Sequence, residues 1–211
     1  MNLSIPEPLT PPLHFSTVQD NLYRGAYPRD VNVPFLRTLQ LRTIVSLTPE
    51  PISPESDPIL YEFCESYNVQ LVHFEVGLGG KGKKRAVPIG YQDVLQILDY
   101  IIHAKYAPLY LHCVNGGQIT SLVVACLRKL QFWSSITIFN EFIDFTTNIT
   151  VNDRSFVEGF SGDIHMDPQD KPSWLWAGFG HGVAASHPAL RIIESSPKES
   201  SPESDDGIVA L

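Results

Sequence analysis

The sequence predicts an α/β domain over residues 14–160. Short apolar runs of strand length alternate in this part of the chain with longer segments whose apolar residues recur at helical spacing. Such alternation of strands and helices is typical of α/β architecture. The chain has 211 residues, of which 43% are hydrophobic, and this content is enough to fill one core of ordinary size.

The first half of this domain is expected to contain three strands and two helices. Asp20 and Asn21 favour a turn before the first strand. A proline begins the first helix, in which Phe35, Leu36 and Leu39 have helical spacing, and the β-branched run TIVSL then predicts a buried strand. The expected order is strand 22–24, helix 34–41, strand 43–47, helix 57–68 and strand 69–76.

The second half is expected to begin with a Gly-rich basic loop and to contain one further strand. The helix that follows the loop places its apolar residues on one face, which indicates that this face packs on the core. Asn152 or Asp153 is expected to cap the last helix. The expected order is loop 77–90, helix 91–105, strand 108–112, helix 121–131, helix 134–147 and helix 153–160.

The segments outside the domain differ from it in composition. Residues 1–13 form a Pro-rich N-terminal extension, and residues 161–185 carry an aromatic cluster that includes Trp174, Trp176 and Phe179. We expect this cluster to pack back on the domain; a partner-binding motif is the alternative. The Ser, Pro and acidic composition of residues 186–211 predicts a disordered tail.

Charge and cysteine usage narrow the classes of function. The net charge of -8 argues against nucleic-acid binding, and no apolar run has the length of a membrane span. The three cysteines are too few and too irregular for a disulfide framework, and no N-terminal signal-peptide pattern is seen. We therefore expect a cytoplasmic protein that needs no metal and no other cofactor.

The stretch LHCVNGGQITS places Cys113 between an expected strand and an expected helix. Successive backbone N–H groups in such a turn can surround an anion, and the helix N-terminus adds partial positive charge. Both effects would favour the nucleophilic thiolate of Cys113, to which the hydroxyl of Thr120 would donate. Gly116 and Gly117 would permit the positive φ angles that a tight loop requires. The expected backbone donors belong to Val114, Asn115, Gly116, Gly117, Gln118 and Ile119.

Two other interpretations of Cys113 remain open at this point. A free cysteine at the end of a strand is often only a small buried hydrophobic residue. A reactive Cys113 would also suit a redox sensor, with Cys126 on the following helix as a partner, although nothing in the sequence indicates that Cys126 can reach it.

The segment LHCVNGGQIT resembles the phosphate-binding loop of the Cys-dependent phosphatases, HCxxGxxR followed by Ser or Thr. His112, Cys113, Gly116 and Thr120 match this pattern. The segments FSTVQDNLYRGAYP, FLRTLQLRTIVSLTPEP and CLRKLQFW are similar, in this order, to the plant and fungal atypical dual-specificity phosphatases and their fungal OCA (oxidant-induced cell-cycle arrest) branch. The resemblance covers 14–160 and implies a central sheet flanked by helices.

The departures from the family pattern concern the groups that carry charge. The family's phosphate-binding arginine corresponds to Ile119. The remaining loop positions, at which active relatives carry Lys, Arg or His, are Val114, Asn115, Gly117 and Gln118. The family also implies a general acid in the loop after the strand at 69–76, yet 76–90 contains no Asp or Glu and only Glu75 and Asp93 flank it.

These losses are expected to leave little catalysis. One strong transition-state donor contributes about 10²–10³ in rate, and a general acid contributes roughly 10²–10⁴. The basic residues of the 77–90 loop, which faces the pocket in the family, are the one source of compensation; the alternative is that they are simply solvated. These residues are Lys81, Lys83, Lys84 and Arg85.

The resemblance therefore implies two functions. The first is a pseudophosphatase that keeps Cys113 and acts as a binding or scaffold subunit, with a phosphorylated ligand and related phosphatase-like subunits as partners in a hetero-complex. The alternative is a weak Cys-dependent phosphatase that hydrolyses phosphotyrosine or inositol pyrophosphates through a phosphocysteine intermediate.

Overall fold

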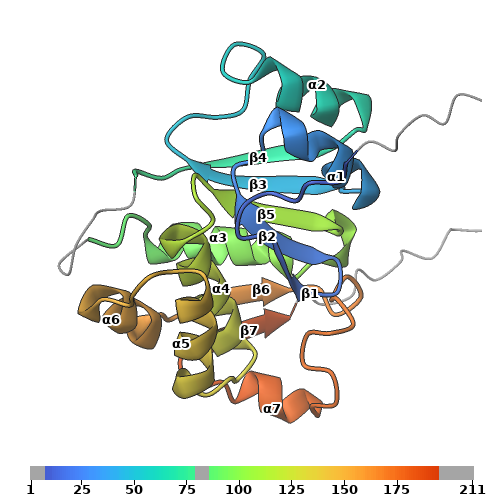
Figure 1. Ribbon diagram of the computed structural model, residues 1–211. Coiled ribbons are helices and arrows are strands. Elements are labelled where there is room, and N and C mark those ends of the chain that lie inside the picture. Colours follow the sequence, from blue (N-terminus) through green and yellow to red (C-terminus); the bar gives the residue numbers. More distant parts are fainter. Residues whose placement is uncertain (1–7, 79–85, 195–211) are drawn as a thin grey trace, which may run out of the picture.

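The computed structural model describes residues 8–78 and 86–194 and contains a five-stranded sheet (Figure 1). The strands run in the order β1-β2-β5-β3-β4, and β1 alone is antiparallel to its neighbour. Their bounds are Ser16–Gln19 (β1), Leu22–Ala26 (β2), Thr43–Thr48 (β3), Gln70–Glu75 (β4) and Leu109–Cys113 (β5). All strands expected over 14–160 are present; β1, which has four residues and an irregular register against β2, was not foreseen.

The middle of the sheet determines where the Cys113 loop lies. Every residue of β3 and β5 is buried, as expected for parallel strands that are covered on both faces. Cys113 is in register with Ala26 of β2 and with Leu47 of β3, so the carboxyl ends of these three strands lie side by side. Ligands of open α/β sheets bind outside this edge.

Helices cover both faces of the large sheet. Figure 1 shows α1 and α2 on one face and α3 and α4 on the other. Because side chains of a strand alternate between faces, Tyr110 packs in the core beneath α1 and α2, whereas Leu109 and Leu111 pack in the core beneath α3 and α4. The bounds are Val33–Thr38 (α1), Pro58–Ser66 (α2), Tyr91–Ile101 (α3), Gln118–Leu130 (α4), Ser135–Asp144 (α5), Val151–Gly159 (α6) and His181–Ala185 (α7), with short 3₁₀ turns at Asp30–Asn32 and Ala104–Tyr106. Over 8–78 and 86–194, no helix combines the length and the apolar character needed to cross a lipid bilayer.

The cap of α6 differs from the expectation. Thr150 is the N-cap, and its hydroxyl accepts a hydrogen bond from the Asp153 N–H. The Asp153 carboxylate in turn accepts a hydrogen bond from the Thr150 N–H, at 2.9 Å. This reciprocal capping box begins the helix before Asn152, so the expectation of a cap at Asn152 or Asp153 was wrong.

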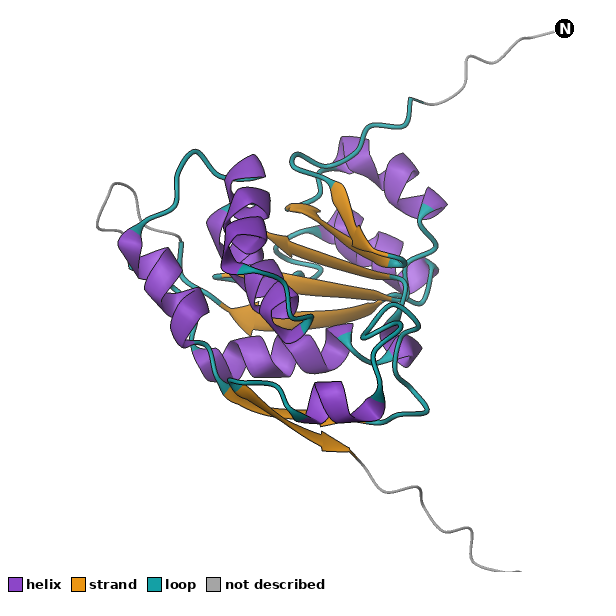
Figure 2. Ribbon diagram, turned by 90° about the horizontal axis from the view of Figure 1, so that it is seen from below, coloured by secondary structure: helices purple, strands orange, loops and turns teal. Residues whose placement is uncertain are grey.

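The chain beyond residue 160 forms a second, small sheet. Strands β6 (Gly162–Met166) and β7 (Leu190–Glu194) pair in parallel, and Figure 2 shows them apart from the large sheet, across a helical layer. Strand β7 lies in the range that was expected to be a disordered tail, and its pairing with β6 explains why it is ordered. The Trp176 indole is buried and donates to the Leu130 carbonyl at 2.9 Å, while Phe179 is half exposed.

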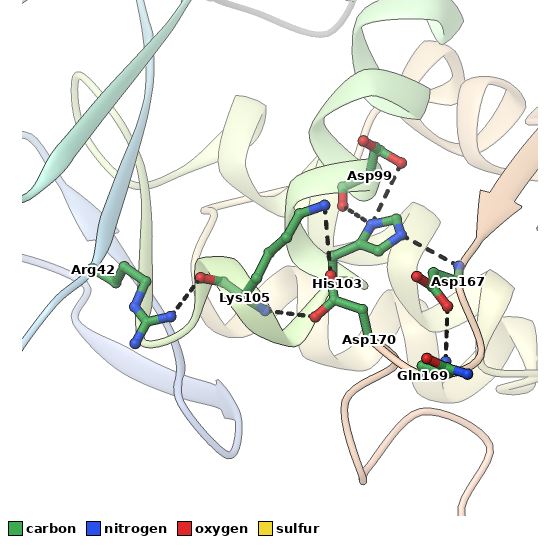
Figure 3. A network of polar contacts seen from close by, with 7 residues as sticks. All are labelled: Arg42, Asp99, His103, Lys105, Asp167, Gln169 and Asp170. Atoms are coloured by element: carbon green, nitrogen blue, oxygen red, sulfur yellow. Dashed lines mark hydrogen bonds and ion pairs between the residues drawn. The ribbon is translucent and has the colours of Figure 1, made fainter. Parts of the chain in front are cut away.

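Hydrogen bonds join this C-terminal segment to the end of α3 (Figure 3). The His103 imidazole Nε2 accepts from the Asp167 N–H at 3.4 Å, so its Nδ1 carries the proton and donates to the Asp99 carbonyl at 2.7 Å. The Lys105 N–H donates to the Asp170 carboxylate at 2.9 Å. Residues 167–170 are therefore held against the turn that leads from α3 into β5.

Candidate active site

The loop from Cys113 to Gln118 joins β5 directly to α4 at the carboxyl edge of the sheet. Cys113 is the last residue of β5, is buried, and has a free thiol. Gly116 has φ +68°, and a Cβ at this position would lie 2.6 Å from the Ala26 nitrogen and 2.6 Å from the Gly25 carbonyl carbon. The loop therefore packs on the backbone of β2 so closely that only glycine fits at residue 116.

The side chain of Asn115, an exposed residue, forms hydrogen bonds with two groups of this loop. Its carboxamide oxygen accepts a hydrogen bond from the Gly117 N–H at 2.9 Å and one from the Cys113 thiol, with 3.6 Å between sulfur and oxygen. The His14 imidazole contacts the Asn115 backbone carbonyl at 2.9 Å. Because an oxygen of a bound oxyanion would accept from the same Gly117 N–H, the ligand would have to displace the Asn115 carboxamide.

The side chain at the position of the family arginine does not enter the loop. Ile119 is 5% exposed and belongs to the same apolar core as Cys113. The Thr120 hydroxyl is fully buried and has no hydrogen-bond partner in the described part of the chain, so the expected bond to the Cys113 sulfur is not formed. Val114, by contrast, projects toward solvent.

Gln118 links the start of α4 to α6. Its amide nitrogen donates to the buried Asp153 carboxylate at 2.7 Å, and the same carboxylate accepts from the Thr150 hydroxyl at 2.8 Å. Asp93, one of the two acids near the 76–90 loop, accepts a hydrogen bond from the Gly90 N–H at the start of α3. Glu75 is exposed at the end of β4. Among the described residues, neither flanking acid forms a hydrogen bond or an ion pair with the Cys113 loop.

Four of the expected anion-binding residues cannot be placed. Lys81, Lys83, Lys84 and Arg85 lie outside the described residues. Their compensating role stays a prediction.

Arg24, which the sequence-based reasoning did not select, is a cation directly beneath the loop. Its side chain is 1% exposed, and its Nη2 donates to the Gly116 carbonyl at 3.1 Å and to the Ser121 hydroxyl at 2.7 Å. The Phe145 ring lies over the guanidinium, 3.7 Å from its carbon to the ring centroid. Burial lowers the pKa of Arg24 to about 10, so the group remains charged at neutral pH. The sequence feature that could have identified Arg24 is its position as the one charged residue of strand β2.

His112 adds no charge to the site at neutral pH. Its ring is fully buried, and burial lowers the pKa of His112 to about 4. It stacks on Tyr110 with 5.7 Å between ring centroids and meets Tyr27 edge to face at 5.3 Å. His112 is therefore a neutral packing residue of β5.

A hollow of about 330 Å³ lies beside the loop, at the carboxyl ends of β2 and β3. Its lining residues are Tyr27, Thr48, Pro49, Glu50, Pro51, Ser56 and Val114. The charged side chain in this lining is the carboxylate of Glu50, so the hollow adds no cation that would attract a phosphorylated ligand.

Comparison with known proteins extends the similarity along most of the chain. The family model described as the tyrosine phosphatase family matches residues 9–178. The OCA6 protein of Saccharomyces cerevisiae, whose name places it among the tyrosine-protein phosphatases, is 41% identical over 204 residues, which cover 90% of each chain. Inositol diphosphatase DSP1 of Oryza sativa subsp. japonica is 35% identical over 153 residues, covering 72% of this chain and 66% of its own.

A solved structure of a phosphatase has a fold similar to that of this chain. The core catalytic domain of the PP-IP phosphatase SIW14 from S. cerevisiae, in complex with citrate, has a TM-score of 0.63 and 29% sequence identity. The match covers 73% of this chain and 89% of that chain. The chain belongs to the tyrosine phosphatase family and has the α/β fold of the Cys-dependent phosphatases.

Proposed function

We propose that this chain is a pseudophosphatase, which keeps the phosphate-loop shape and acts by binding rather than by turnover. The observation that carries the proposal is the place of Ile119, which lies in the apolar core where the family pattern has the phosphate-binding arginine. Without that arginine, the loop has no bidentate cation to hold the transferred phosphoryl group.

Two further features support the loss of turnover. The Asn115 carboxamide engages the Cys113 thiol and the Gly117 N–H, which are the groups that attack and hold a phosphoryl group. In the described part of the chain, Glu75 and Asp93 form no hydrogen bond or ion pair with the loop that would position them to protonate a leaving oxygen. Losing both the clamp and the acid costs on the order of 10⁴ or more in rate.

The proposed partners are related phosphatase-like chains, with which this one would form a hetero-complex in the cytoplasm. The support is the resemblance to the OCA branch, and the three cysteines are free, as suits a reducing compartment. We expect affinity capture from a fungal extract to recover such relatives with the full chain, and fewer of them with a chain that lacks 165–211. If the full chain captured no family member, the proposed hetero-complex would be refuted.

A weak phosphatase is the second candidate, because Cys113 is retained and the DSP1 relative bears the name of an inositol diphosphatase. The two functions separate in a turnover assay with a small aryl phosphate and with an inositol pyrophosphate. The pseudophosphatase predicts that the wild-type rate equals that of Cys113→Ser on both substrates. A wild-type rate above that of Cys113→Ser would favour the weak phosphatase.

A further inference from the structure

We propose that Arg24 is the positioning residue of the anion-binding loop and that it supplies the positive charge lost with the family arginine. The inference deepens the proposed function, since it concerns how the same loop would hold the oxyanion of a phosphorylated ligand.

The peptide between Gly116 and Gly117 connects Arg24 to the inside of the loop. Its carbonyl accepts from Arg24 Nη2 at 3.1 Å, and its N–H donates to the Asn115 carboxamide at 2.9 Å. Because a trans peptide is planar, its C=O and N–H point in opposite directions. The hydrogen bond from Arg24 on the outside therefore turns the Gly117 N–H toward the inside.

The guanidinium is itself held in place from several directions. The Ser121 hydroxyl on the first turn of α4 accepts from Nη2 at 2.7 Å, and the Phe145 ring covers one face of the group. Strand β2 also provides Gly25 and Ala26, against which Gly116 packs. One strand thus supplies both the surface under the loop and the cation that orients it.

Among the described residues, the Arg24 guanidinium has no carboxylate in direct contact, although the Glu141 carboxylate attracts it from beyond ion-pair distance. In the described chain Arg24 takes part in no ion pair, and its Nε and Nη1 atoms are buried without hydrogen-bond partners. Buried polar groups are normally paired, so two unpaired N–H groups on one arginine require an explanation. A cation kept partly unsatisfied beside Cys113 favours an anion in the loop, because low polarity around it strengthens the attraction.

Arg128 shows how an arginine with a purely structural role is held in this protein. It is equally buried, yet its Nε and Nη2 bind Glu141, its Nη1 binds Gln131, and its Nη2 also binds the Val18 carbonyl. It lies in the last turn of α4, at the opposite end of the helix from the loop. Arg128 therefore provides a comparison for the loss of a buried guanidinium, with the difference that its partner Glu141 also attracts Arg24.

The test measures tungstate affinity by calorimetry and the amide resonances of Gly116 and Gly117 by NMR. Arg24→Met is expected to lose about tenfold or more in tungstate affinity, which corresponds to one charge-assisted hydrogen bond. It should also shift the Gly117 amide in the ligand-free protein. Arg24→Lys should recover part of the affinity, and Arg128→Met should stay within about twofold of wild type although its melting temperature falls as well.

If Arg24→Met does not fold, Ser121→Ala takes its place in the comparison. This change removes the hydroxyl that accepts from Arg24 Nη2, and it is expected to lower tungstate affinity by a smaller factor. Equal tungstate affinity in wild type and Arg24→Met, an equal loss in Arg128→Met, or no tungstate binding by the wild type would overturn the inference. Wild-type turnover above that of Cys113→Ser would contradict the proposed function but not the inference about Arg24. The inference depends only on the relative tungstate affinities of the wild type and the arginine variants.

Discussion

Replacing Ile119 with arginine is expected to raise affinity for tungstate by about one to two orders of magnitude and to leave turnover absent. A guanidinium at this position would make charge-assisted, bidentate hydrogen bonds to the oxyanion, each of about 1.5–3 kcal/mol. The gain is partly offset because the anion must displace the Asn115 carboxamide from the Gly117 N–H. Turnover stays absent because the substitution supplies no general acid.

Ile119→Met is the matched control, since it keeps an apolar side chain of similar volume in the core and adds no charge. Calorimetry with tungstate measures the affinity, and release of phosphate from an aryl phosphate measures turnover. An Ile119→Arg protein that binds tungstate no better than Ile119→Met would show that the loop has lost its anion-binding shape. Turnover that disappears in the Ile119→Arg, Cys113→Ser double variant would contradict the expectation that Ile119→Arg leaves turnover absent.

Gly116→Ala is expected to lower the free energy of unfolding by about 3 kcal/mol or more, and to abolish tungstate binding. The φ of +68° is unfavourable for alanine, and the new methyl group would lie 2.6 Å from backbone atoms of β2, which cannot move without disturbing the sheet. The loop would have to leave β2, and the bond between Arg24 and the Gly116 carbonyl would break.

Gly77→Ala is the control for this change, because a Cβ at residue 77 meets no atom of the described residues within 4 Å and φ lies outside the left-handed region. Urea unfolding of the two variants measures the difference in stability. The packing of the loop on β2 would be refuted if Gly116→Ala unfolded at the same urea concentration as Gly77→Ala.

The large sheet and the place of the site follow from local sequence patterns. The runs TIVSL and PLYLH are apolar because β3 and β5 are covered on both faces, so their composition alone indicates buried strands. The Gly-rich turn after Cys113 marks the loop, since Gly116 has a backbone conformation that other residues avoid. These features depend on residues that are neighbours in the sequence, so the sequence alone predicts them.

Other features depend on contacts between distant residues. Arg24 contacts Gly116 and Ser121 only because β2 pairs with β5. In the sequence, Arg24 is more than 90 positions away from both residues. Strands β6 and β7 are short, carry polar residues, and gain their order from pairing with each other. Neither contact leaves a local pattern in the sequence.

The position of the Asn115 side chain was equally inaccessible. An asparagine in a Gly-rich turn is common, and the sequence gives no sign that its carboxamide turns inward to the Cys113 thiol. Under the proposed function, this hydrogen bond of Asn115 is a second obstacle to catalysis, in addition to the missing arginine.

Transfer of a phosphoryl group to Cys113 is the step that a pseudophosphatase lacks, and a labelled inositol pyrophosphate measures it directly. The protein is mixed in excess with the compound, labelled in its terminal phosphate, and quenched within the first seconds. We predict that the label bound to wild-type protein equals that bound to Cys113→Ser. Labelled phosphocysteine in the wild type, absent from Cys113→Ser, would contradict the assignment and identify the chain as a phosphatase.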